Sequence, residues 1–177
     1  MGKKILMVIA PEDFRDEEYQ IPLQIFEKEG LQITVASSRR GFARGSLGIT
    51  APIDILLEEA HARDFDAVVF IGGKGSWDYF DNRQAQRLAR ESADTAATLL
   101  CAICSAPGIL AKAGVVEGKR VTSFQRETEL LKSKGAFFTG ERVETDGRLI
   151  TGNGPQASEA FARSIVEALK VKQETNL

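Results

Sequence analysis

Short runs of hydrophobic, mostly β-branched residues alternate along this chain with stretches in which hydrophobic positions recur at helical spacing. The runs predict buried strands over residues 5–10, 31–36, 66–71 and 95–103. The amphipathic stretches predict helices over residues 17–30, 82–94 and 158–170. A continuous hydrophobic run such as 66–71 is typical of a strand that is buried on both faces of a sheet.

The remaining pattern is weaker and predicts small β elements. We expect a β segment within residues 49–55 and short strands over 121–123, 137–139, 143–145 and 149–151. Asp146-Gly147 lies between the last two strands and is a strong hairpin signal. The polar tail over residues 171–177 is expected to fray.

Alternation of strands and helices implies an α/β fold, with a mostly parallel sheet and helices on both of its faces. The chain has 177 residues and shows no linker or internal repeat, so we expect a single domain over residues 1–177. In such sheets functional sites lie at the carboxyl ends of the strands. The loops over residues 10–18, 72–77 and 104–107 should therefore meet at one edge.

Composition narrows the class of protein. A formal net charge of −2 argues against nucleic acid or an anionic membrane surface as a partner. The hydrophobic runs are too short to cross a membrane. Two cysteines and the lack of an export signal predict a cytoplasmic protein with free thiols. No glycine-rich dinucleotide or phosphate loop occurs and soft metal ligands are few, so we expect no cofactor and no metal.

Cys104 is the most informative residue, because it falls between a predicted strand and a helix that has Pro107 in its first turn. The sulfur is expected at the carboxyl edge of the sheet, where a substrate can reach it. Helix N–H groups should lower the pKa of the thiol. A buried structural thiol is the competing interpretation, and the local pattern alone leaves both open.

Cys101 and His61 are weaker candidates for chemistry. Cys101 lies in the predicted strand, so it should point to the opposite face from Cys104 and act as a buried core residue rather than as a redox partner. His61 is the single histidine and precedes the strand at 66–71. It should therefore lie at the opposite edge of the sheet, which disfavours a Cys–His catalytic pair.

Two other features support a reactive Cys104. The backbone N–H groups that follow the strand at Gly72-Gly73, together with the N–H of Ser105, could form an oxyanion hole. Carboxylates also crowd the first strand–helix turn, although most of them should be ordinary solvated groups: Glu12, Asp13, Asp16, Glu17 and Glu18.

The order and spacing of several segments resemble the DJ-1/PfpI superfamily over nearly the whole chain. The segments are Glu18-Tyr-Gln-Ile-Pro22, Val68-Val-Phe-Ile-Gly-Gly73, Ala102-Ile-Cys-Ser-Ala-Pro107, Gly118-Lys-Arg-Val-Thr-Ser123, Val143-Glu-Thr-Asp-Gly147, Thr151-Gly-Asn-Gly-Pro155 and Ile165-Val-Glu-Ala-Leu169. The resemblance implies a flavodoxin-like three-layer sandwich with a nucleophile elbow, and usually a homodimer. It also implies that Cys104 is the nucleophile, that Glu18 is its carboxyl partner, and that Gly73 and Ser105 supply the oxyanion N–H groups.

The chain departs from the family pattern at three positions. The peptidase-like branch has histidine directly after the cysteine, where this chain has Ser105. Phe124 replaces a second family histidine, and Asn153 replaces an arginine. The site therefore lacks an imidazole, and Glu18 is the only candidate proton carrier.

These residues predict a cysteine-dependent protein that acts on small aldehydes or dicarbonyls such as methylglyoxal, in the manner of the family's glyoxalases and deglycases. We expect a resting state in which the Cys104 thiolate faces protonated Glu18, because two like charges at contact distance share a proton. A non-catalytic oxidation sensor that forms a sulfinate on Cys104 and a holding chaperone remain alternatives. Peptide hydrolysis is disfavoured, because no histidine is available to protonate the leaving amine.

Overall fold

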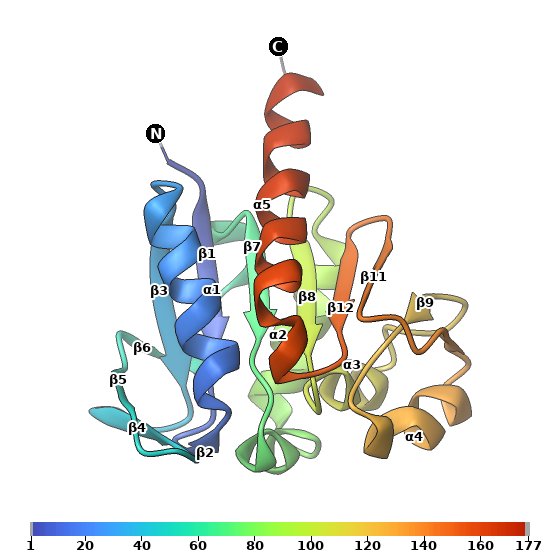
Figure 1. The fold of residues 1–177 in the computed structure, drawn as a ribbon, viewed down its shortest axis with the longest axis horizontal. Coiled ribbons are helices and arrows are strands. Elements are labelled where there is room, and N and C mark those ends of the chain that lie inside the picture. Colours follow the sequence, from blue (N-terminus) through green and yellow to red (C-terminus); the bar gives the residue numbers. More distant parts are fainter. Residues whose placement is uncertain (1, 176–177) are drawn as a thin grey trace.

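The chain is described by a computed structural model over residues 2–175, and a seven-stranded sheet forms its centre (Figure 1). The strand order is β11-β12-β8-β7-β1-β3-β6. The strands are β1 (Lys4–Val8), β3 (Gln32–Ser37), β6 (Ile55–Leu56), β7 (Ala67–Phe70), β8 (Leu99–Ile103), β11 (Val143–Asp146) and β12 (Leu149–Gly152). Neighbouring strands are parallel except for the antiparallel pair β11 and β12.

Helices cover both faces of this sheet and complete a three-layer α/β sandwich. The helices are α1 (Asp16–Lys28), α2 (Arg83–Asp94), α3 (Pro107–Ala113), α4 (Thr128–Ser133) and α5 (Ser158–Thr175). α1 packs against α5 on one face, in front of the sheet in Figure 1, and α2 packs against α3 on the other face. The fold class expected from the alternation of elements is confirmed.

Side chains alternate between the two layers along each central strand. In β1, Ile5 and Met7 pack with α1 and α5, whereas Leu6 and Val8 pack on the side of α2 and α3. The four side chains are almost completely buried. The uninterrupted hydrophobic runs of the sequence therefore arise because both faces of the sheet are covered.

The sequence pattern did not predict two short strands. β2 (Glu12–Phe14) and β4 (Phe42–Gly45) were missed, and they form a small separate sheet with β5 (Thr50–Pro52). The β segment expected within residues 49–55 is therefore divided between β5 and β6, which belong to different sheets. The remaining short strands, β9 (Arg120–Val121) and β10 (Phe137–Phe138), pair in parallel as a two-stranded sheet.

Two predicted element boundaries differ from the structure by four residues or more, whereas the other strands and helices differ by one or two. The strand expected over residues 95–103 begins only at Leu99, because Thr95 ends α2 and residues 95–98 form a turn. The last helix continues to Thr175, so the expectation of a frayed tail from residue 171 is wrong; residues 176–177 lie outside the described part of the chain. This tail lacks glycine and proline, the residues that most strongly end a helix. The hairpin at Asp146-Gly147 is confirmed, with Gly147 at a φ of 59°.

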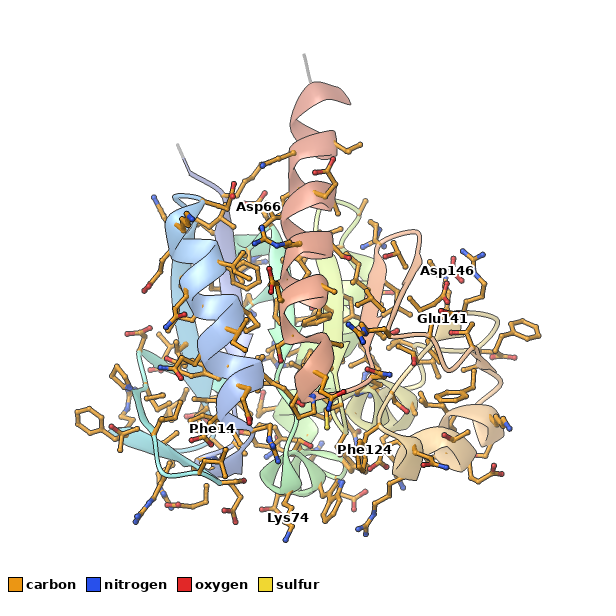
Figure 2. The ribbon with its side chains drawn as sticks, viewed as in Figure 1. Phe14, Asp66, Lys74, Phe124, Glu141 and Asp146 are labelled. Atoms are coloured by element: carbon orange, nitrogen blue, oxygen red, sulfur yellow. The ribbon has the colours of Figure 1, made fainter. Side chains whose placement is uncertain are left out.

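Short 3₁₀ helices and loops gather at the carboxyl edge of the sheet. They are η3 (Lys74–Tyr79), η4 (Gln125–Glu127) and η5 (Pro155–Ala157). Figure 2 shows Lys74 and Phe124 at this edge and Asp66 at the opposite edge. In the part of the chain that the structure describes, none of the helices has both the length and the apolar character that a membrane crossing needs.

Candidate active site

Cys104 forms a sharp turn between β8 and α3. Its φ is 63°, a left-handed conformation that costs a residue with a side chain about 1 kcal/mol or more. Two hydrogen bonds hold this conformation: the Cys104 N–H donates to the Gly152 carbonyl (2.9 Å), and the Cys104 carbonyl accepts from the Phe124 N–H (2.7 Å). The predicted nucleophile elbow is therefore present, and its strain marks Cys104 as a candidate functional residue.

Glu18 projects from α1 and is completely buried. Its Oε1 accepts a hydrogen bond from the Gly72 N–H (3.1 Å), while Oε2 is buried and has no N–H or O–H donor among the described residues. A Cβ atom added to Gly72 would lie 2.7 Å from both Cys104 Cβ and Glu18 Oε1. A side chain at this position would overlap with both groups, so the contact between Cys104 and Glu18 requires a glycine here.

The environment raises the pKa of both groups. Burial raises the pKa of Glu18 to about 8, against a smaller opposing effect of its contact with the Cys104 thiol. Burial, followed by the charge of Glu18 and the contact with its carboxyl, raises the pKa of Cys104 to about 12. The hydroxyl and N–H of Ser105 act in the opposite direction but are outweighed. The expected lowering of the thiol pKa is therefore wrong, because Cys104 is only 7% exposed.

These shifts also correct the expected resting state. At neutral pH Glu18 is protonated, as expected, but Cys104 is a thiol rather than a thiolate. Two of the three causes that raise the pKa of Cys104 act through Glu18, and the repulsion disappears when Glu18 is protonated. The pair therefore loses one proton near pH 8, and the proton that remains is shared between sulfur and carboxyl.

Arg15 is a site residue that the sequence analysis missed. Its backbone N–H donates to the Gly72 carbonyl (2.9 Å), and its guanidinium donates to the Glu17 carboxylate at 2.7 and 3.1 Å. The bond to Glu17 raises the pKa of Arg15 most, and attraction to Glu18 and Cys104 adds to the effect. In the sequence, only its position three residues before Glu18 pointed to a role in the site. The fold shows that Arg15 lies near both Glu18 and Cys104.

The expected oxyanion groups lie next to the elbow. Ser105 is buried, and its N–H and hydroxyl interact with the Cys104 sulfur. Gly73 has a φ of 100°, and a Cβ there would lie 2.5 Å from the Arg15 nitrogen, so a glycine is required. Gly73 and Ser105 thus lie with Cys104 at the carboxyl edge of the sheet. Their role as oxyanion donors stays a prediction.

Cys101 and His61 lie where they cannot assist Cys104. Cys101 is fully buried in β8, as expected, but it borders the same core layer as Cys104 rather than the opposite one. The left-handed turn at Cys104 breaks the alternation of the strand. His61 lies near Glu91 (Nδ1 to Oε2, 3.8 Å), and the strand that follows it starts beside Asp66, at the opposite edge of the sheet (Figure 2).

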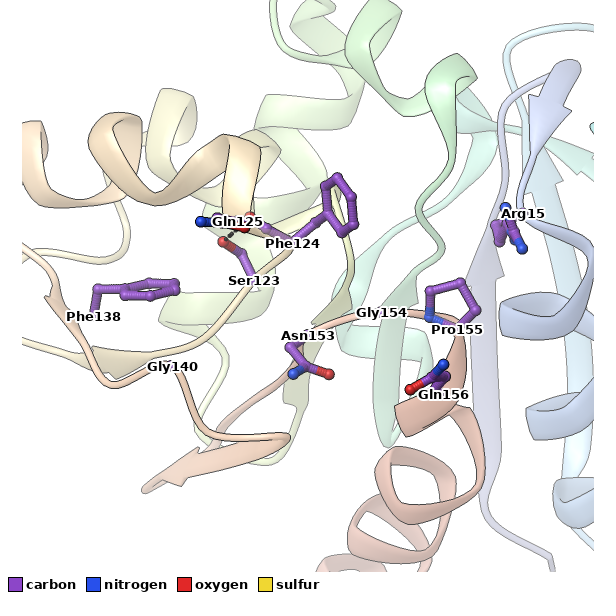
Figure 3. A pocket seen from close by; sticks show the side chains of 10 residues that line it. All are labelled: Arg15, Ser123, Phe124, Gln125, Phe138, Gly140, Asn153, Gly154, Pro155 and Gln156. Atoms are coloured by element: carbon purple, nitrogen blue, oxygen red, sulfur yellow. Dashed lines mark hydrogen bonds between the residues drawn. The ribbon is translucent and has the colours of Figure 1, made fainter.

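A pocket of about 600 Å³ lies at the carboxyl edge of the sheet (Figure 3), and neither Cys104 nor Glu18 is among the residues that line it. Its lining comes from four separate segments of the chain: Arg15, Ser123, Phe124, Gln125, Phe138, Gly140, Asn153, Gly154, Pro155 and Gln156. Two of these residues are tied to Cys104 through the backbone. The Phe124 N–H donates to the Cys104 carbonyl, and Asn153 directly follows Gly152, whose carbonyl accepts from the Cys104 N–H. The pocket walls are therefore attached to the nucleophile elbow.

The model of the DJ-1/PfpI family matches residues 3–168. The chain belongs to the DJ-1/PfpI family. The family resemblance noted in the sequence is thus confirmed, and the three-layer fold agrees with it.

Three family members illustrate the similarity. A ThiJ/PfpI domain protein of Brachyspira murdochii has a solved structure with a TM-score of 0.93 and 35% identity, covering 96% of this chain and 98% of its own. An uncharacterized protein of Methanocaldococcus jannaschii is 34% identical and covers 97% of this chain and 84% of its own. A protein of Pyrococcus furiosus named deglycase PfpI is 30% identical and covers 94% of this chain and 99% of its own.

This DJ-1/PfpI family member differs from the expected family pattern within the site. Ser105 follows the elbow cysteine, Phe124 hydrogen-bonds to it through the backbone, and Asn153 lines the pocket. None of these side chains can act as a proton carrier at neutral pH. Glu18 is the carboxyl group that interacts directly with Cys104.

Proposed function

We propose that this protein is a cysteine-dependent enzyme for small reactive carbonyls, with Cys104 as the nucleophile and Glu18 as the proton shuttle. The observation that carries the proposal is the buried contact between a strained elbow cysteine and the Glu18 carboxyl group, for which the neighbouring Gly72 leaves room. Relatives named as deglycases support this class of reaction. The family resemblance further supports a cytoplasmic homodimer in which residues 1–177 act as one domain.

The reaction with methylglyoxal begins from the singly charged pair. The Cys104 sulfur adds to the aldehyde carbon, and the carbonyl electrons move to oxygen, where the N–H groups of Gly73 and Ser105 stabilise the charge. Removing one good oxyanion donor commonly costs about 3–4 kcal/mol of barrier. Glu18 protonates the oxyanion to give a thiohemiacetal, and its carboxylate is then free to act as a base.

Glu18 next takes the proton from the former aldehyde carbon, which gives an enediol. Return of a proton to the neighbouring carbon leaves a hydroxy-acyl thioester on Cys104. Water cleaves this thioester and releases lactate and the free thiol. The overall reaction converts methylglyoxal and water into lactate. The aldehyde carbon is oxidised while the neighbouring ketone carbon is reduced, so no external oxidant or cofactor is needed.

A pH–rate profile tests the coupled pair. We expect kcat/KM for methylglyoxal to rise about tenfold per pH unit below pH 8 and to level off above it, because the reactive species is the pair that has lost one proton. The measurement is lactate release between pH 5.5 and 9.5 under substrate concentrations far below KM. A profile that levels off near the ordinary pKa of a glutamate would contradict the assignment of Glu18.

The alternative role as an oxidation sensor is favoured by one feature, the buried Glu18 Oε2 that lacks a donor. When protonated, this carboxyl could donate to an oxygen added to Cys104. Mild peroxide is then expected to add two oxygens to Cys104 and none to the fully buried Cys101, as measured by intact-mass analysis and peptide mapping. Earlier modification of Cys101 would exclude this role.

A further inference from the structure

The pocket at the carboxyl edge of the sheet contains a single ionised side chain. Of its ten lining residues only Arg15 carries a charge, and the rest are aromatic residues, amides, a serine, a proline and glycines. Aromatic and amide groups suit many organic ligands, whereas a lone cation discriminates by charge. The charge of Arg15 is therefore the most selective feature of the pocket.

The guanidinium of Arg15 is only partly used within the protein. Two of its five N–H donors bind the two oxygens of the Glu17 carboxylate (2.7 and 3.1 Å), and the described residues offer no further acceptor to the other three. Both side chains are partly exposed, at 38% and 35%. A surface pair of this kind contributes little stability, so a competing carboxylate can share or replace it at low cost.

The pocket is also much larger than the smallest dicarbonyl requires. A volume of about 600 Å³ falls in the range of sites for drug-sized ligands, whereas methylglyoxal has about five heavy atoms. Arg15 is close enough to Cys104 and Glu18 for its charge to act on both. It can therefore offset the repulsion between a negatively charged substrate and the singly charged pair.

We propose that this pocket selects reactive carbonyl substrates that carry a carboxylate. Arg15 binds the carboxylate, and the carbonyl extends past the walls at Phe124 and Asn153 toward Cys104, which does not itself line the pocket but is hydrogen-bonded to both walls through the backbone. The inference deepens the proposed function and rests on it. A carboxylate fits better than a phosphate, because Arg15 is the one cation lining the pocket and a dianion would leave charge unpaired. Glu17 already shows how a carboxylate is held by this guanidinium.

A suitable probe is 4,5-dioxopentanoate, a 2-oxoaldehyde with a carboxylate at the far end. Addition of Cys104 to its aldehyde, followed by the proton shifts and thioester cleavage described above, converts the probe plus water into 2-hydroxyglutarate. 2-Oxopentanal is the matched neutral compound, because a methyl group takes the place of the carboxylate. The quantity of interest is the ratio of the two kcat/KM values, in which general effects on catalysis cancel.

We expect Arg15→Gln to lower this ratio by about 10- to 100-fold, the usual effect of losing charge-assisted hydrogen bonds. Glu17→Gln should raise the ratio, because it removes the internal competitor for Arg15. Arg126→Gln is the control: this arginine stacks on Trp77 at 3.8 Å and does not line the pocket, so the ratio should stay within about twofold. An unchanged ratio in Arg15→Gln would overturn the inference.

Direct binding separates failure of the inference from failure of the proposed function. Glutarate, an unreactive dicarboxylate, is titrated against the Cys104→Ser protein by calorimetry, and glutaramide serves as the neutral control. We expect glutarate binding that Arg15→Gln weakens at least about tenfold and Glu17→Gln strengthens. Binding of this kind without any turnover of either oxoaldehyde would refute the proposed reaction but support the pocket assignment. No preference for glutarate over glutaramide would refute the pocket assignment.

Discussion

Replacement of Cys104 by serine is expected to reduce methylglyoxal turnover by at least about 10³-fold, to the level of the uncatalysed reaction. Loss of the attacking group in enzymes with covalent catalysis commonly costs this much or more. Serine keeps the size and the hydrogen bonds of the elbow, but its hydroxyl is a far weaker nucleophile and Glu18 is too weak a base to ionise it. The measurement is lactate release by the wild type and the variant at pH 8.5.

The matched control is Cys101→Ala, which removes the other thiol from the fully buried interior of β8. This variant should lose stability through a small cavity but keep turnover within a few-fold at a temperature where it is folded. Circular dichroism establishes that both variants are folded. Equal activity of the wild type and Cys104→Ser would remove the enzyme hypothesis altogether.

Replacement of Glu18 by glutamine is expected to have opposite effects on activity and stability. Activity should fall by about 10²–10⁴-fold, because the only proton shuttle is lost. The free energy of unfolding at pH 8.5 should rise by on the order of 3 kcal/mol. To fold at this pH, the wild type must either bury the Glu18 carboxylate or take a proton from the solvent, and both cost free energy that the neutral glutamine does not. Glutamine can still accept the hydrogen bond from the Gly72 N–H through its amide oxygen.

The sign of this stability change follows from the raised pKa. Burial raises the pKa of Glu18 in the folded protein to about 8 from an ordinary value of 4.5. The folded state therefore binds the proton more tightly, and wild-type stability falls as pH rises from about 4.5 to 8. Denaturant unfolding should show the gain of Glu18→Gln at pH 8.5 and lose it near pH 4, where the carboxyl is neutral in both states.

Glu17→Gln provides the control for this experiment. The Glu17 carboxylate is partly exposed and its hydrogen bond with Arg15 lowers its pKa, so its stability effect has the opposite sign. Neutralising it should cost at most about 1 kcal/mol. A stability loss in Glu18→Gln at pH 8.5 would contradict the burial penalty assigned to Glu18.

The central sheet and the elbow could be predicted because they depend on local pattern. Hydrophobic runs of strand length report burial on both faces, and the segment from Cys104 to Pro107 has the signature of a strand–helix junction. β2 and β4 could not be predicted, because three or four residues give no usable periodicity. They become strands only through tertiary pairing, β2 with β4 and β4 with β5, at the carboxyl edge of the main sheet.

The electrostatics of the site depended on tertiary structure in the same way. The N–H that lowers the pKa of Cys104 belongs to Ser105, in the turn before α3, rather than to the helix, and burial by distant segments has the larger, opposite effect. The role of Arg15 also depends on the fold, which places its guanidinium beside a pocket wall formed by residues more than a hundred positions later. Sequence identified the reactive pair through a family resemblance, whereas its charge state required the packed structure.

The hydrogen bond from the Gly72 N–H to Glu18 Oε1 gives the protein a built-in spectroscopic probe. This peptide nitrogen lies within the buried contact, and its proton points at the oxygen whose charge changes. In a ¹⁵N–¹H correlation spectrum the Gly72 resonance should follow the ionisation of the pair, with a midpoint near pH 8, even in a protein that has no substrate. The titration of a single glycine amide would therefore report the acid–base chemistry of two side chains that ordinary kinetics can only observe together.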